Sequence, residues 1–421
     1  MTSDAAAGNG TVIRAILFCA GFLGYLVPLI LPIMVRNIAA DLGTDVTTVG
    51  TLIGLQSIVV GVASLFVGPI SDRYGRKKML TLFLILNGAA LCLFSQSRSL
   101  ESFYLTGVLS AVAFSPLVFC ALAYIGDYFA MRERGGVVGL VSGALYGAIA
   151  LGVPIAVALM QSTLGWRAVF IAFGLFSVGV GLVSLGGLVN RGVSQQAAKG
   201  AVLATLSRYV SFLREPRLVG FLMVFFMIRL GVGMYFTYGP TYLLLSRDFP
   251  PYGFSLIYPV GAVLAFIASV YAGKLQNRAS SKLIIMLASL SIITSIVLVV
   301  SYPTTVQDVV LIMGILSTGY MVSESFRMAT LNAEAVSRVD ATARGSFLGT
   351  VNFLIYIGTA LGAFIGGSLL NLTQAAADHG VQLQVAFTNM VYLTSLLWAV
   401  SALLSLFVIG QKTRSTSAAA A

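Results

Sequence analysis

Long apolar runs alternate with short polar segments along the whole of this sequence. Each of the twelve runs is close to the about 20 residues that an α-helix needs to cross the hydrocarbon core of a bilayer. The pattern therefore predicts an all-α membrane protein with twelve transmembrane helices.

The runs form two sets of six, separated by the polar segment 190–217. The predicted spans are 15–35, 49–67, 79–95, 103–125, 137–160 and 168–189, then 218–245, 254–275, 283–301, 309–333, 346–370 and 385–409. We expect an N-terminal bundle over 1–189, a cytoplasmic linker over 190–217, and a C-terminal bundle with a short cytoplasmic tail over 218–421. Within the linker, the basic stretch 203–214 is expected to lie on the inner leaflet as an amphipathic segment.

Composition supports the membrane prediction, since 58% of the residues are hydrophobic, 9% are charged and the mean hydropathy is +0.96. A net charge of +11 would suggest nucleic acid in a soluble protein, but here the basic residues lie between apolar runs, which argues against such a partner. Cys19, Cys92 and Cys120 all lie inside apolar runs, so neither a disulfide framework nor a metal site is expected.

The distribution of Lys and Arg predicts the orientation of the chain. Alternate loops carry most of the basic residues, which is typical of the cytoplasmic side. We therefore expect both termini in the cytoplasm and a multi-pass protein of the cytoplasmic membrane. The basic residues that lie elsewhere are Arg36, Arg98, Arg167 and Arg247 in outer loops, and Arg229 and Arg327 inside predicted spans.

A glycine-punctuated basic loop lies between the second and third predicted helices. Its residues Gly68, Asp72, Arg73, Gly75 and Arg76, with Lys77 and Lys78 following, resemble the signature of the major facilitator superfamily. An ordinary cytoplasmic loop would explain the basic residues but not the glycine and aspartate spacing. The resemblance implies two pseudo-symmetric six-helix bundles and transport by alternating access, with the substrate site between the halves at mid-membrane.

The two sets of helices look like copies of one another. Gly68 and Arg73 recur 205 positions later as Gly273 and Arg278, and Gly152 recurs 210 positions later as Gly362. The segment Arg134-Gly135 recurs at the same 210-residue offset as Arg344-Gly345. Two registers of this kind are not expected by chance, so the halves are interpreted as parallel repeats.

Two further motifs refine the resemblance. Gly165-Trp166-Arg167, at the outer start of the sixth predicted helix, is found in many superfamily members; an interfacial Trp with a flanking Arg is the alternative interpretation. The fifth predicted helix is similar to the glycine-rich helix of the drug/proton antiporter branch, although Val153 separates its glycine from its proline. That helix carries Gly139, Gly143, Gly147, Gly152 and Pro154.

In the family, the Asp and first Arg of the signature loop close the cytoplasmic side together with an acid at the end of the fourth helix. Asp127 occupies that position here, so the resemblance implies an Asp72, Arg73 and Asp127 latch. Its expected neighbours are Gly68, Arg76 and Arg134. The alternative is a set of solvated loop charges.

Charges inside a membrane span are costly and usually face a cavity. Arg229, Glu324 and Arg327 meet this description. Arg stays protonated, so both arginines are candidate sites for a substrate anion, whereas Glu324 can accept a proton and is the candidate coupling residue. A structural ion pair of Glu324 with Arg229 or with Arg327 is the competing interpretation. Aromatic walls with hydroxyl groups are expected from Tyr25, Tyr235, Tyr238, Tyr258, Tyr320 and Tyr356.

The sequence argues against an enzyme because it has no His or Cys cluster, no paired acids and no phosphate-binding loop; His379 is expected on the surface, and no cofactor or metal is expected. We expect a monomeric secondary transporter for a small organic solute that is anionic, zwitterionic or amphipathic, driven by protons, with export favoured by the antiporter resemblance. Uptake of an organic anion with protons is the alternative, and a passive channel or sensor is the alternative of another class. The solute itself is not identified.

Overall fold

The computed structural model describes residues 3–129, 131–189, 212, 214–246, 249–275, 279–301, 309–338, 344–374 and 379–409. The chain divides into two compact units, Met1–Val202 and Leu203–Ala421. Each unit is described by itself.

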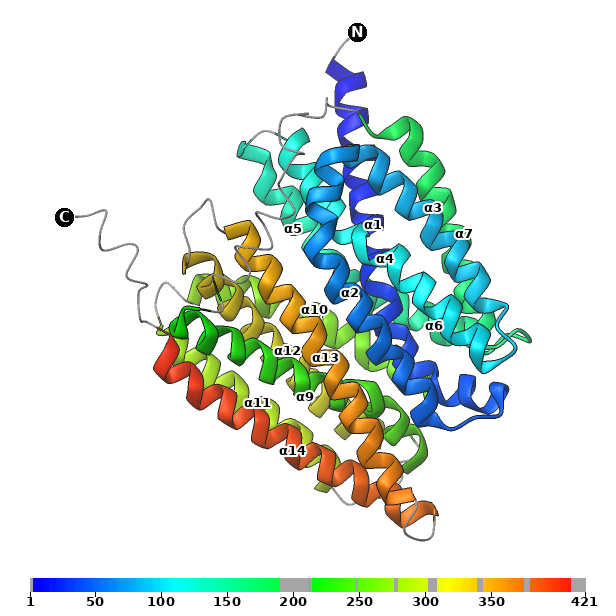
Figure 1. Cartoon of the computed structure of the whole chain (residues 1–421), viewed down its shortest axis with the longest axis vertical. Coiled ribbons are helices and arrows are strands. Elements are labelled where there is room, and N and C mark those ends of the chain that lie inside the picture. The colour runs from blue at the N-terminus through cyan, green and yellow to red at the C-terminus, as the bar shows by residue number, and fades with distance from the viewer. Residues whose placement is uncertain are drawn as a thin grey trace, which may run out of the picture. The chain divides into compact units, whose positions relative to one another are not determined.

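The first unit contains six spans (Figure 1). The fifth span consists of two α-helices joined by a π-helical turn, η1, and the other spans are single α-helices. In chain order they are α1 (Ser3–Leu42), α2 (Val46–Tyr74), α3 (Arg76–Ser95), α4 (Leu100–Tyr128), α5 (Met131–Gly147), η1 (Ala148–Gly152), α6 (Val153–Met160) and α7 (Trp166–Gly187).

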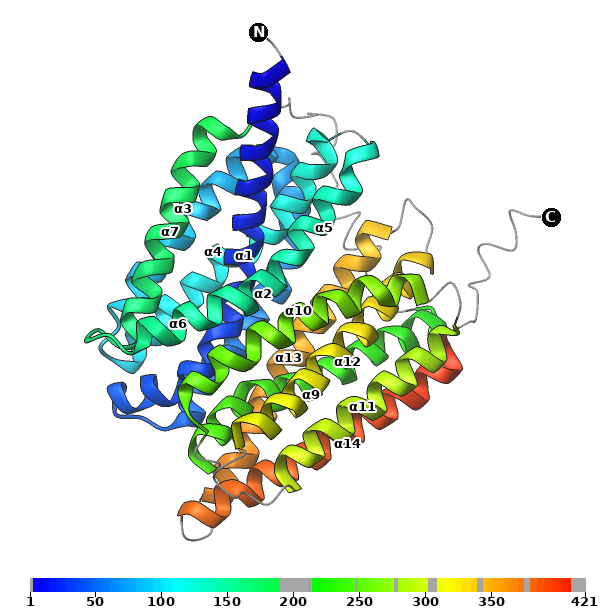
Figure 2. The ribbon, with the colours of Figure 1, turned by 180° about the vertical axis from the view of Figure 1, so that it is seen from behind.

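The second unit repeats this arrangement with six uninterrupted helices (Figure 2). They are α9 (Pro216–Ser246), α10 (Pro251–Leu275), α11 (Ser281–Ser301), α12 (Val309–Ser337), α13 (Arg344–Gln374) and α14 (His379–Val408).

Twelve helical segments of the described chain are long and apolar enough to cross a membrane, which confirms the predicted all-α membrane fold. Large apolar side chains such as Leu105 and Phe407 are more than 70% exposed, as expected where helices face lipid. The predicted and observed spans overlap throughout. The clearest difference is at the first helix, which continues to Leu42 and ends before Gly43, whose φ is 64°.

Helix packing follows the same scheme in both units. The first span packs on the fifth, the second on the fourth, and the third on the sixth. The pairs α3 with α7 and α11 with α14 are visible side by side in both views (Figures 1 and 2). The two units are therefore structural repeats, in agreement with the sequence registers.

Glycines allow the first and fifth spans of each unit to approach closely. A Cβ atom added at Gly362 would lie 2.0 Å from the Leu230 carbonyl oxygen, and one at Gly233 would lie 2.1 Å from the Thr359 carbonyl oxygen. In the first unit, a Cβ atom at Gly152 would lie 2.3 Å from Leu26 Cδ1. Gly152 and Gly362, paired in the sequence repeat, thus each face the first helix of their own unit. Such small-residue contacts allow backbone-to-backbone packing in membranes.

The fifth span of the first unit is interrupted at η1, directly before Val153 and Pro154. Pro154 has no N–H group to donate to the preceding turn, and a π-helical turn accommodates the missing bond. A Cβ atom at Gly147, on the other side of η1, would lie 3.0 Å from Phe18 of α1. The π-helical turn before Pro154 therefore lies beside α1.

Buried polar groups connect α3 to α7. Asn87 Nδ2 donates to Ser177 Oγ at 3.0 Å, and the hydroxyls of Thr81 and Ser184 are 2.7 Å apart. Interhelical hydrogen bonds of this kind contribute about 0.6 kcal/mol on average in membranes. They determine which faces of the two helices meet.

In each unit, a side chain near the end of the fourth span forms hydrogen bonds with the backbone at the end of the sixth span. Tyr124 Oη donates to the Val189 carbonyl at 3.1 Å and accepts from the Val189 amide at 3.0 Å. In the second unit, Arg338 Nη2 donates to the Val408 carbonyl at 2.9 Å. Burial lowers the pKa of the Arg338 guanidinium, and the adjacent Glu334 opposes that shift.

The start of α2 has a side-chain cap outside the membrane span. Asp45 Oδ1 accepts a hydrogen bond from the Thr48 amide at 2.7 Å. Partial burial raises the pKa of the Asp45 carboxyl, but hydrogen bonds from Thr48 and from the Asp45 and Thr47 backbone together lower it more, and the net pKa is below its ordinary value. The cap is therefore formed by the ionised carboxylate at neutral pH.

Candidate substrate and coupling site

The helix α12 holds a buried ion pair between Glu324 and Arg327, one turn apart. Arg327 Nε donates to Glu324 Oε2 at 2.9 Å, and Nη2 of the same guanidinium also contacts that oxygen. The Arg327 side chain is fully buried, whereas 16% of the Glu324 side chain is exposed. Of the two ion pairs left open by the sequence, the one within α12 is therefore present.

Trp398 of α14 covers the other side of the guanidinium. The Arg327 Cζ atom lies 4.9 Å from the centre of the indole ring. Tyr320, one turn before Glu324 on α12, stacks on the same indole with ring centres 6.1 Å apart. A desolvated cation–π contact contributes about 2 kcal/mol, so Trp398 stabilises the charge of Arg327 alongside the carboxylate.

The same tryptophan is bound to α9. Its Nε1 donates to the Ile228 carbonyl oxygen at 2.9 Å. A Cβ atom at Gly231 would lie 2.5 Å from that Nε1, so a glycine is required there for the indole to reach the helix backbone. Trp398 therefore contacts both the α12 ion pair and the α9 residue that precedes Arg229.

Arg229 of α9 has no hydrogen bond or ion pair within the described part of the chain, and its Nε atom is buried without a partner. Two atoms of the ion pair are in the same condition, namely Glu324 Oε1 and Arg327 Nη1. The charge of Arg229 acts electrostatically on the hydroxyls of Tyr320 and Tyr356. Buried polar atoms nearly always have partners, and these three belong to charged side chains that all act electrostatically on Tyr320, so they indicate a site that binds polar groups.

The predicted tyrosines are placed differently from one another. The ring centres of Tyr235 and Tyr320 are 5.7 Å apart, and Tyr258 lies edge-on to Phe254 on α10. Tyr356, on α13, is half-buried. By contrast, Tyr238 is fully buried and donates to the Ala363 carbonyl at 3.1 Å, so its hydroxyl connects α9 to α13.

Tyr25 belongs to α1 of the other unit and is half-buried there. The structure thus brings together the predicted residues of the second unit, while Tyr25 stays a separate candidate. Trp398 was missed by the sequence analysis because an aromatic residue in an apolar run is ordinarily a packing residue.

The predicted latch residues lie near three helix ends. Gly68, Asp72 and Arg73 lie in the last turns of α2, Asp127 near the end of α4, and Arg134 near the start of α5, but the contacts of these five residues lie outside the described part. Arg76 begins α3, and its Nη1 donates to Ser71 Oγ at 2.7 Å. Between α2 and α3, Gly75 has φ of 94°, a positive value that glycine adopts without steric cost.

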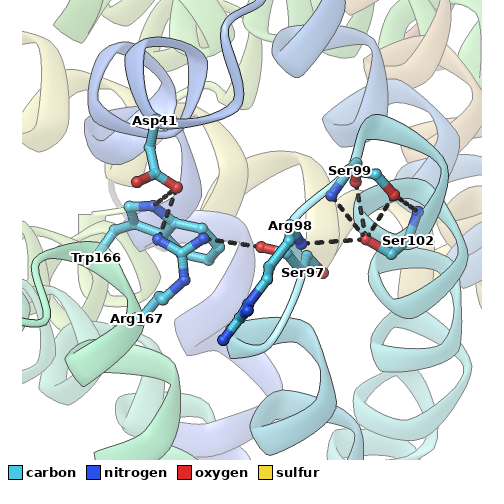
Figure 3. A network of polar contacts seen from close by, with 7 residues as sticks. All are labelled: Asp41, Ser97, Arg98, Ser99, Ser102, Trp166 and Arg167. Carbon is cyan, nitrogen blue, oxygen red and sulfur yellow. Dashed lines mark hydrogen bonds and ion pairs between the residues drawn. The ribbon is translucent and has the colours of Figure 1, made fainter.

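A polar network joins helix ends of the first unit at the side away from the predicted latch residues (Figure 3). Arg167 Nη1 lies 2.6 Å from Asp41 Oδ2, and Nη2 donates to the Ser97 carbonyl at 2.8 Å. The guanidinium also lies 4.5 Å from the centre of the Trp166 ring. The Trp-Arg motif therefore connects the end of α1, the turn before α4 and the start of α7. Asp41 was not identified from the sequence because it lies far from Arg167 along the chain.

Two six-helix units that repeat one another, with buried charges in the second, are typical of membrane transport proteins. Within the described residues, no group of three or more His, Cys, Asp or Glu side chains is placed to hold a metal ion. The sequence profile of the Major Facilitator Superfamily matches residues 15–363, and the chain belongs to this family.

Named relatives transport several kinds of small solute. The chain is 29% identical over 168 residues to a probable L-galactonate transporter of Escherichia coli, which covers 40% of this chain and 37% of the relative. It is 27% identical over 173 residues to the riboflavin transporter RibZ of Clostridioides difficile, covering 40% of this chain and 36% of the relative. Multidrug resistance protein 2 of Bacillus subtilis is 24% identical over 357 residues, covering 83% of this chain and 86% of the relative. The alignments with the first two relatives thus span little more than a third of their lengths.

Solved structures agree on the fold. A bacterial homologue of the human lysosomal transporter Spinster matches with a TM-score of 0.77 at 12% identity, covering 95% of this chain and 97% of that protein. The nucleoside transporter NupG matches with a TM-score of 0.73 at 14% identity, covering 94% of this chain and all of that protein. At these identities the similarity establishes the major facilitator fold, with no implication for the substrate.

Proposed function

We propose that the protein is a proton-coupled secondary transporter that moves a small organic anion across the cytoplasmic membrane by alternating access. The observation that carries this proposal is the pairing of Glu324 with Arg327 while Arg229, in the same unit, has no counter-ion among the described residues. An uncompensated cation within a membrane span favours a ligand with a negative group.

The ion pair links the proton to the anion. When Glu324 is ionised, it occupies Arg327 through two contacts with Oε2. When Glu324 is neutral, that attraction weakens and Arg327 becomes available to the same anion as Arg229. Proton and anion then favour each other's binding, which is the requirement for symport. An inward proton gradient would drive uptake.

The relatives are compatible with this substrate class. L-galactonate, the substrate in the printed name of one relative, is a sugar acid with a carboxylate. A carboxylate is also the group that an arginine binds most readily through two parallel hydrogen bonds. We therefore take a small carboxylate as the first substrate to test.

Export of an amphipathic solute is the second candidate function. It is favoured by the similarity to Multidrug resistance protein 2 along most of both chains, and by the glycine-rich fifth span. A cationic solute would compete with the proton for Glu324 instead of binding with it, and the coupling would become exchange. The two candidates thus predict opposite effects of pH on substrate binding.

We further propose a monomer with cytoplasmic termini and a linker at 190–217, and a cytoplasmic latch formed by Asp72, Arg73 and Asp127. The positively charged loops and the family signature support this orientation. Asp72→Asn should slow transport while leaving the amount of protein near normal, because the group lies at the wet interface. Transport at the unmodified rate in both Asp72→Asn and Asp127→Asn would refute the latch.

The function is tested with purified protein in liposomes. Uptake of L-galactonate and of a panel of carboxylates, zwitterions and cations is measured under imposed pH gradients of either sign. We expect a carboxylate to accumulate when the outside is acidic, Glu324→Gln to lose the response to the gradient, and Arg229→Ala to lose anion binding. Glu101→Gln, at an exposed position in the first turn of α4, is the matched control and should behave like the unmodified protein. Gradient-driven transport by Glu324→Gln would show that this residue is not the proton carrier.

A further inference from the structure

We propose that Trp398 is a positioning residue that transmits the protonation of Glu324 to the anion site at Arg229. The inference rests on the proposed function and assigns a role to a residue outside the charged group. Trp398 is fully buried on α14, and its indole contacts α12 through Arg327 and α9 through the Ile228 carbonyl.

The contacts of the indole are directional and use different parts of the ring system. The face of the indole contacts the guanidinium of Arg327 and the ring of Tyr320. Its N–H group donates a hydrogen bond to the Ile228 carbonyl oxygen. Gly231 leaves space for that N–H group on α9. The indole is a rigid ring system that is hydrogen-bonded to the α9 backbone. A displacement of the Arg327 guanidinium against its face therefore moves the whole indole, including the N–H group.

Protonation of Glu324 changes what holds Arg327. In the ionised state the guanidinium is shared between the carboxylate and the indole face. In the neutral state the carboxylate attraction is reduced, and the indole is the main described partner that remains. The resulting shift of the indole alters its hydrogen bond to Ile228, whose carbonyl carbon is bonded directly to the Arg229 nitrogen.

Other titratable or charged groups surround this cluster. They are Tyr320 and Arg327 on α12 itself, Arg229 and Tyr235 on α9, Tyr258 on α10 and Tyr356 on α13. The tyrosines stay neutral in the range in which a carboxylate titrates, and the arginines stay charged. Glu324 carries the carboxylate of this set, so a pH response of the cluster is assigned to it.

A role in packing alone is the competing interpretation, because Trp398 also fills space against Gly231. Packing alone does not make the Ile228 carbonyl respond to the charge of Glu324 through the indole. Direct electrostatics from Glu324 to Ile228 is a second competitor, and it does not require the indole N–H group. An experiment that measures the pH response of the Ile228 carbonyl with and without the indole N–H group distinguishes the proposal from both competing interpretations.

The protein offers two convenient resonances for nuclear magnetic resonance. The sequence has two tryptophans, so the indole N–H region holds two signals, and Trp166→Phe identifies the one from Trp398. Ile-Arg occurs at Ile13-Arg14 and Ile228-Arg229, so labelling with ¹³C-carbonyl Ile and ¹⁵N-Arg gives two carbonyl signals, and Arg14→Lys identifies the one from Ile228. Both signals are followed from pH 4 to pH 9 in lipid nanodiscs without substrate.

We expect the Trp398 N–H and Ile228 carbonyl signals to move with one common midpoint, and both movements to be lost in Glu324→Gln. In Trp398→Phe, which keeps an aromatic ring but has no N–H group, Ile228 should lose at least half of its pH-dependent shift. Trp166→Phe is the matched control and should keep the full shift. An Ile228 shift of unchanged size in Trp398→Phe would overturn the proposal, as would a Trp398 signal that does not depend on pH.

Failure of this inference can be told from failure of the proposed function. If Glu324→Gln loses gradient-driven uptake in liposomes but Trp398→Phe leaves the Ile228 shift unchanged, the function stands and the role of Trp398 is refuted. If Glu324→Gln retains gradient-driven uptake, the proton-carrier assignment itself is wrong. Where Trp398→Phe is poorly folded, the titration of the intact Trp398 signal in the Trp166→Phe background still refutes the proposal if that signal is independent of pH.

Discussion

Replacing Gly233 with alanine should disrupt the contact between α9 and α13. The new Cβ atom would lie 2.1 Å from the Thr359 carbonyl oxygen, which is 1.3 Å less than the 3.4 Å at which ordinary van der Waals contact begins. The next nearest atoms, at 2.8 and 2.9 Å, also belong to the Thr359 backbone. A backbone cannot rotate out of the way as a side chain can, so the two helices must separate.

The expected cost follows from this geometry. Overpacking of a core costs about 1–3 kcal/mol, and a clash with backbone belongs at the upper end of that range. Alanine regains about 0.5–1 kcal/mol over glycine inside a helix, which offsets only part of the loss. For a domain of about 200 residues, 1 kcal/mol corresponds to roughly 2–4 °C in Tm, so we expect Tm to fall by several degrees. Arg229 lies one turn before Gly233, so anion uptake should also decrease.

Thermal unfolding in detergent, followed by a thiol-reactive dye, measures the effect. Two further glycine-to-alanine variants complete a graded series. Gly21 of α1 would place its Cβ atom 3.0 Å from Ala144 Cβ, a milder contact, and Gly179 of α7 has no atom within 4 Å. We expect Gly233→Ala to have the lowest Tm, Gly21→Ala an intermediate one, and Gly179→Ala one at or above that of the unmodified protein. A Gly233→Ala protein as stable as Gly179→Ala would refute the close backbone contact.

Three further predictions concern single polar groups. Asp45→Ala should remove the α2 cap and cost about 0.5–2 kcal/mol at pH 7. Because the pKa of Asp45 is lowered in the folded protein, the stability that the cap contributes should be lost as the pH falls through that pKa. The Tm difference between the unmodified protein and Asp45→Ala should therefore be smaller at pH 3 than at pH 7. An equal Tm difference at pH 3 and pH 7 would contradict this. A double-mutant cycle of Asp41→Asn and Arg167→Gln should give a coupling of about 0.2–1 kcal/mol, and additive Tm changes would contradict it. Tyr124→Phe should cost about 1–2 kcal/mol and speed hydrogen exchange at the Val189 amide, whereas unchanged exchange would argue against the hydrogen bond.

The fold could be predicted because bilayer thickness fixes the length of an apolar helix. The same constraint explains the errors at the ends of spans: α1 continues to Leu42, beyond the predicted end of its apolar run, since a helix need not stop where lipid does. The buried pair of Glu324 and Arg327 could be proposed as well, because residues three apart on a helix share a face.

Contacts between distant parts of the chain could not be predicted in this way. Trp398 lies 71 positions after Arg327, and nothing in its apolar surroundings marks it as the partner of a cation. Asp41 and Arg167 meet because α1 ends and α7 begins at the same side of their unit, which depends on helix packing rather than on local pattern. The choice between Arg229 and Arg327 as partner of Glu324 likewise depends on how α9 and α12 are placed.

The π-helical turn in the fifth span has a consequence for insertions and deletions. Gly147 and Gly152 are five residues apart and both face α1, whereas five residues of regular α-helix would separate them by about 140° around the axis. The corresponding face of α13 carries Gly358, Gly362 and Gly366. Residues four apart lie on the same face of a regular α-helix, so no π-helical turn is needed there. With Pro154 also replaced by a residue that has an N–H group, deleting one residue between Gly147 and Gly152 would allow a regular helix and keep both glycines on the α1 face, whereas inserting one would turn one of them away. Length variation at this point should therefore be tolerated in one direction only.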